Sequence, residues 1–479
     1  TPESCLPSTV RGGVRRAVQD LSGKRVGIMP KPQSTLPLLD HLRPTDKDGP
    51  LISVVMTTYA LDPEQNFLEL DFIPTLLGLG SVHDRGYAVP VAVERRLGDA
   101  HFSLMCDSHA VSSGVRPSLR IELRTTGPKT QHAKVTLIHR RRLIRLIVAS
   151  ANLTHESYRR QREVGTILDF TPYGGLDPGV LQEAVDGWLS ALGSNMSDST
   201  KRALQRAVDE SASWPATGEH RPRVLWGGTT VPLYQQFIEQ WPQKEAVERI
   251  VVVSPFWPEP GKVLTPFEGI AEALELRGAH LHDAELHLVT QAEAPLEKAR
   301  PLFPFELVRD LRERGFPIRK GWICPARLDT LPDESPDLRG EGTRPLHGKL
   351  VAVVGPKTTL LLLGSANFTR KGLGAGIAPA HANVEASVAV RLRRDDLDLK
   401  FLLPPLVEAG RVDWATCGKE SLAEVPRADE DEVTAWPDFI DRVEIAIAWG
   451  AQPTGELLVH ARAGEMPSFS MLICEEEPV

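Results

Sequence analysis

Apolar residues along the chain fall into short runs typical of buried strands, separated by longer amphipathic stretches typical of helices. Helical periodicity covers 67–77 and roughly 178–211 in the first half. Strand-like runs of the same half occupy 51–63, 88–93, 101–106 and 119–124, followed by the pair HAKVTLIH and LIRLIVASA. Strands that alternate with helices in this way predict an α/β layered fold.

The same order of elements recurs from about residue 222. RIVVVSPFWPEP repeats the earlier LISVVMTTYALDP as a buried strand that ends in an aromatic, proline-containing turn. Helical stretches at 263–277 and 303–313 surround the strand ELHLV, and the pair HGKLVAVV and TLLLLGSAN follows. A repeat of this length predicts two lobes. We therefore divide the chain into an N-terminal arm at 1–50, a first lobe at 51–221, a second lobe at 222–423, a linker at 424–433 and a β-rich C-terminal segment at 434–479.

The composition is that of a globular protein, since 41% of the 479 residues are apolar and 25% are charged. No run of about eighteen apolar residues occurs, so no transmembrane helix is expected. The five cysteines are scattered and lack the Cys-x-x-Cys or Cys/His spacing of a zinc site. Together with an N-terminus that lacks the layout of a signal peptide, they favour a reducing, cytoplasmic setting, with no bound metal and no cofactor.

One short pattern of polar residues occurs twice among the strand-like runs. Lys follows His by two positions and Asn follows it by twenty in both copies, which comprise His132, Lys134 and Asn152, then His347, Lys349 and Asn367. Composition alone gives fewer than one His-x-Lys triplet in a chain of this length. The repeated set is therefore a specific signal.

The spacing of the pattern has a geometric meaning. Side chains alternate faces along a strand, so His and Lys two positions apart point the same way. A hairpin centred on residue 142 places Asn152 opposite His132, and one centred on residue 357 places Asn367 opposite His347. Each copy is thus predicted to gather an imidazole, an ammonium and a carboxamide at one end of a hairpin.

Such a set of groups suits the cleavage of a phosphodiester. One imidazole can attack phosphorus and form a phosphohistidine, which divides one difficult displacement into two easier ones. Ammonium and carboxamide groups can hold the nonbridging oxygens, and the second imidazole can protonate the leaving oxygen and later deprotonate water. One copy is then half of an active site, and the two copies complete it within a single chain without a metal.

Carboxylates at the head of the next strand in each half are candidates to orient an imidazole. Glu385 in NVEASVAV is the favoured one. Glu163 in REVGTIL lies eleven residues beyond its Asn instead of eighteen, so its equivalence stays open and it is placed among the substrate-binding candidates. The motif serines, Ser150 and Ser365, are candidates for substrate binding as well.

These residues resemble the phospholipase D superfamily, whose usual motif is His-x-Lys, four residues, Asp, then Gly-Ser-x-x-Asn. The chain departs from that motif because His139 and Val354 occupy the Asp positions. In lacking this Asp, the chain resembles the tyrosyl-DNA phosphodiesterase branch of the superfamily. The segments ASANLTHESYRRQ and GSANFTRKGLG are also similar to that branch. The resemblance covers most of 50–400 and implies two α/β/α lobes about a pseudo-twofold axis, with the site at their junction. By that analogy His132 is the nucleophile and His347 the general acid/base, although the order can be reversed.

Local charge favours a nucleic acid, with DNA preferred, as the substrate. Residues 115–162 contain twelve Lys or Arg and two acidic residues, although the whole chain carries a net charge of −8. A basic segment beside a phosphate site suits a polyanionic strand, and a solvated face with scattered ion pairs is the other interpretation. Tyr59, Phe256 and Trp257 follow the first buried strand of each half and can stack bases or pack in the core.

The leading hypothesis is therefore a metal-independent nuclease or DNA-end phosphodiesterase, catalytically complete as a monomer and with no membrane partner. A phospholipid headgroup phosphodiesterase or transferase is a second hypothesis. A catalytically silent scaffold that binds nucleic acid and retains the fold is a third. The arm and the β-rich tail suggest a subunit of a larger complex.

Overall fold

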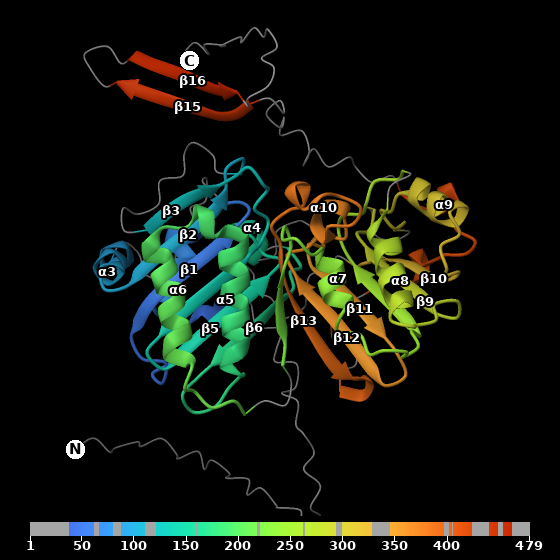
Figure 1. Cartoon of the computed structure of the whole chain (residues 1–479), viewed down its shortest axis with the longest axis horizontal. Helices are drawn as coiled ribbons and strands as arrows, with labels where there is room; N and C mark the ends of the chain where they lie inside the picture. Colours follow the sequence, from blue (N-terminus) through green and yellow to red (C-terminus); the bar gives the residue numbers. More distant parts are fainter. Residues whose placement is uncertain are drawn as a thin grey trace, which may run out of the picture. The chain divides into compact units, whose positions relative to one another are not determined.

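The computed structural model of the chain describes residues 38–61, 67–79, 88–110, 121–159, 161–217, 221–261, 264–293, 299–327, 345–396, 402–404, 406–423, 440–448 and 454–461. Two sheets dominate these residues (Figure 1). The predictions for residues 1–37 of the arm, for the linker at 424–433 and for residues 462–479 of the tail lie outside the described residues.

The first sheet has six strands in the order β3-β2-β1-β4-β5-β6. Their bounds are β1 Leu51–Thr58, β2 His101–Asp107, β3 Ile121–Thr126, β4 Val135–Arg140, β5 Leu143–Ala149 and β6 Gly165–Phe170. β1, β2 and β3 pair in parallel, and β4, β5 and β6 continue the sheet in antiparallel fashion from β1. The inner strands β1, β2, β4 and β5 are buried on both faces, as in sheets that are covered by helices.

The second sheet has eight strands in the order β14-β10-β9-β8-β11-β12-β13-β7. Their bounds are β7 Arg223–Trp226, β8 Arg249–Val253, β9 Glu285–Thr290, β10 Lys320–Pro325, β11 Lys349–Val354, β12 Thr358–Gly364, β13 Ala386–Arg393 and β14 Val412–Asp413. Its central six strands repeat the order and the strand directions of the first sheet. The predicted α/β architecture of two equivalent lobes is confirmed.

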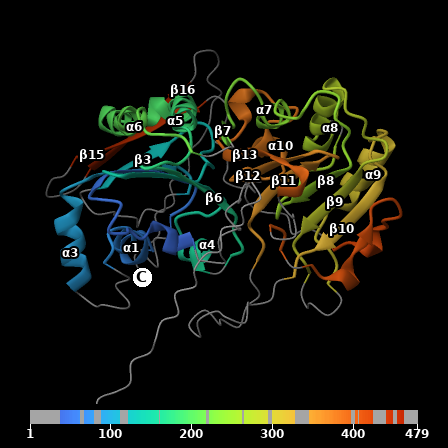
Figure 2. The same cartoon turned by 90° about the horizontal axis from the view of Figure 1, so that it is seen from below.

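Helices cover the two sheets in layers (Figure 2). In the first lobe, α5 Pro178–Leu192 and α6 Asp198–Ser211 cover one face, and η1 Leu38–Leu42, η2 Leu68–Phe72, α1 Ile73–Leu76 and α3 Ala88–Leu97 cover the other. In the second lobe, α7 Leu233–Ile238, α8 Pro266–Leu276 and α9 Phe305–Glu313 share one core with the sheet. The short helices are α4 His155–Arg159, η3 Gly193–Asn195, α10 Arg370–Leu373, η6 Pro379–His381, η7 Arg394–Asp396, η9 Glu408–Gly410 and η10 Lys419–Ser421.

The strand predicted at 88–93 is wrong, because these residues begin helix α3. Val89, Val93 and Leu97 are buried and lie four residues apart, on one face of the helix, whereas Val91 is 74% exposed. The alternating valines suggested a period of two, but burial follows the helical period.

The predicted hairpin alignment is wrong by one residue in both copies. Arg140 lies opposite Leu143, and the same register places His132 opposite residue 151 instead of Asn152. In the second lobe Lys349 lies opposite Gly364, which places His347 opposite residue 366. Each hairpin is thus centred between two residues and not on one, between 141 and 142 in the first copy and between 356 and 357 in the second.

A tryptophan of the second sheet joins the lobes. Trp226, at the end of β7, stacks on Trp188 of α5 with ring centroids 5.7 Å apart, and its indole N–H donates to the carbonyl oxygen of Ala184 at 3.1 Å. The core between α5, α6 and the first sheet continues into Val384, Ala386 and Val388 of the second lobe. A continuous apolar core therefore fixes one lobe against the other.

Near the C-terminus, β15 Ile440–Ala448 and β16 Thr454–Ala461 pair as an antiparallel hairpin where strands were predicted. The status of 434–479 as a separate segment stays a prediction. Within the described residues, no helix has both the length and the apolar character needed to cross a membrane.

Replacement of Gly187 by Ala tests the joint between the lobes. A Cβ at Gly187 would overlap the indole of Trp226, so we expect the variant to lose about 1–3 kcal/mol of unfolding free energy in urea denaturation, as overpacked cores do. Gly193→Ala at the end of the same helix is the matched control, because its φ is −60° and the nearest side-chain atom lies 3.9 Å from the added carbon. Equal stability of the two variants would contradict the packing argument.

Candidate active site

Both His-Lys-Asn sets lie at the junction of the lobes, each at one end of its hairpin. Lys134 immediately precedes β4 and Lys349 opens β11, while the Asn residues follow β5 and β12 by three positions. The His residues precede the strands, in short segments that pair with the opposite lobe. Gln131 forms a parallel bridge with Val384, and Leu346 forms one with Arg162.

Backbone hydrogen bonds hold the two imidazole-bearing segments in the same way. The amide of His132 donates to the carbonyl oxygen of Val384 at 2.9 Å, and the amide of His347 donates to that of Arg162 at 3.0 Å. Val384 and Arg162 in turn donate to carbonyl groups two residues before each His, at 2.9 and 3.0 Å. The repetition of the same bonds in both directions is what a pseudo-twofold axis through the junction produces.

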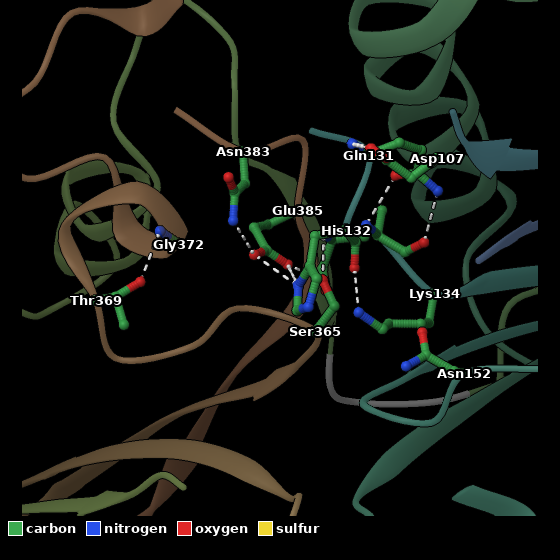
Figure 3. A network of polar contacts seen from close by, with 12 residues as sticks. Asp107, Gln131, His132, Lys134, Asn152, Ser365, Thr369, Gly372, Asn383 and Glu385 are labelled. Atoms are coloured by element: carbon green, nitrogen blue, oxygen red, sulfur yellow. Dashed lines mark hydrogen bonds and ion pairs between the residues drawn. The ribbon is translucent and has the colours of Figure 1, made fainter. Parts of the chain in front are cut away.

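Each imidazole contacts a carboxylate from the other lobe. His132 Nδ1 lies 2.9 Å from Oε1 and 3.0 Å from Oε2 of Glu385 (Figure 3). His347 Nδ1 lies 2.7 Å from Oε1 of Glu163. Glu163 therefore occupies the place equivalent to Glu385, and its assignment to substrate binding is corrected. The eleven-residue spacing concealed this equivalence because only the connecting loop is shorter.

The motif serines bind these carboxylates and do not face a substrate. Ser365 Oγ donates to Glu385 Oε2 at 2.5 Å, and Ser150 Oγ donates to Glu163 Oε2. Both hydroxyl groups also accept a backbone amide of the adjacent strand, at 3.0 and 2.9 Å. Because both serines are fully buried, their predicted role in substrate binding is replaced by a role in holding the carboxylates.

Burial and charge decide the protonation of the groups at the junction. Burial, reinforced by Lys134 and Lys349, lowers the pKa of His132 to about 4 although Glu385 opposes the shift. Burial and Lys349 also lower the pKa of His347, against the effect of Glu163. Near neutral pH both imidazoles are therefore neutral.

The carboxylates stay charged in spite of burial. Burial by itself raises the pKa of Glu163, but His347, Lys349 and the hydroxyl of Ser150 together lower it to about 2. Burial by itself also raises the pKa of Glu385, but His132, Lys134 and the hydroxyl of Ser365 together lower it. A neutral imidazole beside an anionic carboxylate donates its Nδ1–H to it, which leaves the Nε2 lone pair available.

The two lysines act on both imidazoles. Lys134 and Lys349 are only 3% exposed, and Lys134 Nζ donates to the carbonyl oxygen of His132 at 2.8 Å. The charge of Lys349 lowers the pKa of His132, and that of Lys134 lowers the pKa of His347. Groups 215 positions apart thus share one electrostatic environment.

The two carboxamides differ in their contacts. Asn152 Oδ1 accepts the backbone amide of Ala60 at 3.4 Å. Asn367 is 5% exposed, and among the described residues no donor bonds its Oδ1. A buried acceptor of this kind is costly unless a ligand or water satisfies it, so the Asn367 side chain is suited to an incoming O–H or N–H group.

Aromatic rings lie beside both imidazoles. The ring centroid of Tyr59 is 5.2 Å from that of His132, and the ring centroid of Phe256 is 6.4 Å from that of His347. Lys134 Nζ lies 5.5 Å from the Tyr59 ring centroid. Tyr59 therefore keeps its place among the candidates for substrate contact, and Phe256 takes the equivalent place in the second lobe.

Trp257 lies in the core and not beside the site. Its indole donates to Thr290 Oγ1 at 2.9 Å, and its ring packs against Phe303 with centroids 4.6 Å apart. A side chain enclosed in this way cannot stack a base, so the substrate-binding assignment is corrected to packing.

The basic segment at 115–162 contributes mainly to the fold. Arg140 is buried and donates to the carbonyl oxygen of Leu76 at 2.5 Å, and Arg145 forms two bonds with Asp169 at 2.7 Å. Arg124 pairs with a glutamate at 2.7 Å, and Arg116, Arg120 and Arg160 lie outside the described residues. The other interpretation, scattered structural ion pairs, describes these side chains better.

Sequence reasoning missed three residues that support the imidazoles. Gln131 is fully buried, and its backbone amide donates to Asp107 Oδ2 at 2.6 Å, where β2 ends (Figure 3). Asn383 Nδ2 donates to Glu385 Oε1 at 3.3 Å. For Gln131 and Asn383 the only signal was nearness in sequence to His132 and Glu385, and Asp107 gave no such signal. Among the described residues, no group of three or more His, Cys, Asp or Glu is arranged to hold a metal ion.

No protein-family model and no curated protein matches the chain at a significant level. Among solved structures, it is similar to the yeast tyrosyl-DNA phosphodiesterase, at 12% identity and a TM-score of 0.44, over 75% of this chain and 86% of that protein. It is also similar to the polyphosphate kinase of Porphyromonas gingivalis, at 11% identity and a TM-score of 0.37, over 76% of this chain and 43% of that protein.

Proposed function

We propose that the chain is a metal-independent phosphodiesterase that cleaves nucleic acid through a covalent phosphohistidine. The observation that carries the proposal is the crossed pair of contacts, His132 with Glu385 and His347 with Glu163, at 2.9 and 2.7 Å. Two oriented imidazoles with two buried lysines form the set of groups that a two-step displacement at phosphorus uses.

In the first step, neutral His132 attacks phosphorus with Nε2 while its Nδ1–H stays bonded to Glu385. The phosphorus–nitrogen bond forms, the bond to the leaving oxygen breaks, and His347 Nε2 gives its proton to that oxygen. In the second step, His347 takes a proton from water, the resulting hydroxide attacks phosphorus, and the phosphorus–nitrogen bond breaks. His132 is restored as a neutral imidazole, and the phosphate product leaves.

The surrounding charges prepare both steps. Lys134, Lys349 and the two carboxamides can hold the nonbridging oxygens, in a buried site where such interactions are stronger than in water. A bound phosphodiester is an anion that offsets the lysine charges, so it raises the pKa of His347 and favours the protonated form that the first step needs. Binding of the substrate therefore favours protonation of the general acid, His347.

Nucleic acid is the substrate class that we propose, with DNA preferred. The rings of Tyr59 and Phe256, one beside each imidazole, can stack bases on both sides of the scissile phosphate. The yeast protein to which the chain is similar is, by its name, a phosphodiesterase that acts on DNA. A lipid headgroup offers no planar group for these rings.

Cleavage in the presence of EDTA tests the function. We expect hydrolysis of single-stranded DNA, RNA or 3′-adduct DNA in EDTA, and a loss of at least about 10³-fold in His132→Asn and His347→Asn. Asn is chosen because its amide can still donate to the buried carboxylate, which preserves folding. Choline release from phosphatidylcholine vesicles without nucleic-acid cleavage would favour the lipid hypothesis, and turnover of neither substrate would favour the scaffold.

Trapping of the intermediate tests the order of the two imidazoles. With a ³²P-labelled p-nitrophenyl phosphodiester, the leaving group needs no acid, so His347→Asn should accumulate an acid-labile, base-stable phosphoryl label on His132. His132→Asn should give no label. Label on His347 in the wild-type chain would reverse the two roles.

The pH dependence of kcat/KM follows from the protonation states of His132 and His347 in the free enzyme. His132 must be neutral, so the rate should rise through about pH 4, and His347 must be protonated, so the rate should fall as pH rises through its pKa, which burial holds below 6.5. Glu163→Gln should move the basic limb to lower pH, because Glu163 raises the pKa of His347. A kcat/KM that still increases above pH 6.5 would contradict the assignment.

A further inference from the structure

The two carboxylates that orient the imidazoles do not have the same neighbours. Glu385 accepts from Ser365 and, at Oε1, from the side-chain amide of Asn383 at 3.3 Å (Figure 3). The residue at the matching position of the first lobe, two before Glu163, is Gln161. Its Oε1 accepts from Ser157 Oγ at 3.0 Å, within its own loop. One half of the site therefore has a side-chain amide that donates to its carboxylate, whereas the matching amide of the other half, in the part of the chain that the structure describes, accepts from Ser157 through its oxygen.

Asn383 is held in place on both sides. Its backbone amide donates to the carbonyl oxygen of Lys371 at 3.1 Å. Its own carbonyl oxygen lies against Gly227 and Gly228, where an added Cβ would come within 3.2 and 3.0 Å of it. Gly228 has a φ of 71°, a conformation that favours glycine, and this lets the loop after β7 approach Asn383 closely.

Loop length explains why only one half has this contact. Seventeen residues, 368–384, separate Asn367 from Glu385, whereas ten residues, 153–162, separate Asn152 from Glu163. The longer loop contains α10 and lies against the loop after β7 before β13 begins. The shorter loop is taken up by α4, whose Ser157 engages Gln161.

We propose that Asn383 is a positioning residue that acts on His132 through Glu385 and makes the two imidazoles of the site unequal in basicity. This inference rests on the proposed function, since it assigns different tasks to the two imidazoles. Asn383 is not a catalytic residue, because it acts on the site through its hydrogen bond to Glu385 Oε1.

The direction of the effect follows from electrostatics. An amide N–H stabilises negative charge on the carboxylate oxygen that it bonds and so weakens the field that this oxygen exerts on His132. Removal of the donor should strengthen that field and make His132 more basic. The other charged groups that act on His132 are Lys134 and Lys349, and these stay unchanged. The Tyr59 ring faces His132 from β1 and is likewise unaffected.

The test compares Asn383→Leu with the matched control Gln161→Leu in the full chain. Histidine ring ¹³C–¹H signals followed against pH should show the His132 midpoint raised by about 0.5–1 pH unit in Asn383→Leu, with His347 unmoved. Gln161→Leu should leave both midpoints at the wild-type values. The acidic limb of kcat/KM should move with the His132 signal.

The inference is overturned if Asn383→Leu is folded and His132 titrates as in the wild type, or if both imidazoles or both variants shift alike. Asn383→Ala, a truncation to Cβ, covers the case in which the leucine variant does not fold. It removes the donor to Glu385 without adding a charge, so it should raise the His132 midpoint in the same direction, and an unchanged midpoint would also overturn the inference. Because NMR titration needs no substrate, these outcomes are distinct from absent nucleic-acid cleavage, which would count against the proposed function alone.

Discussion

The crossed contacts between imidazoles and carboxylates constrain everything else at the junction. Glu163 and Glu385 are buried, and a buried carboxylate without partners is costly. Each contacts an imidazole of the other lobe, so separation of the lobes would leave each carboxylate with the serine of its own lobe but without its imidazole. The serines, lysines and backbone bridges around the pairs compensate the same buried charge. Assembly of the site and docking of the lobes are thus one event.

Repetition of the fold explains why the contacts cross. The six strands that the two sheets have in common share order and direction, and the strand that follows the carboxylate, β6 or β13, is the last of the six in each. A pseudo-twofold axis that relates the lobes also relates their contacts, so each lobe gives its carboxylate to the imidazole of the other lobe. His132 therefore receives Glu385 for the same geometric reason that His347 receives Glu163. The continuous core around Trp226 then prevents the lobes from sliding apart.

Local patterns predicted the strands and the motif, and long-range contacts decided the rest. The strand pairs and both His-Lys-Asn sets could be read from sequence because alternation and spacing are local. The helix at 88–97 was missed because valine favours strands, while burial of Val89, Val93 and Leu97 follows the helical period. The role of Glu163 could not be read, since spacing along the chain does not reveal a contact 184 positions away. The count of basic residues led to a wrong role for the arginines of 115–162, because composition does not show that Arg145 is bound to Asp169.

A symmetric scaffold must nevertheless perform two unequal tasks, attack on phosphorus and transfer of a proton. Identical halves would give imidazoles of equal basicity, with no preference for either task. The differences lie in parts that the symmetry does not constrain, namely the loops between each Asn and its Glu and the rings of Tyr59 and Phe256. A loop can change its length without disturbing either sheet, whereas a change in the crossed pairs would expose a buried charge. The loops can therefore make the two imidazoles differ, while the duplicated core keeps both of them oriented.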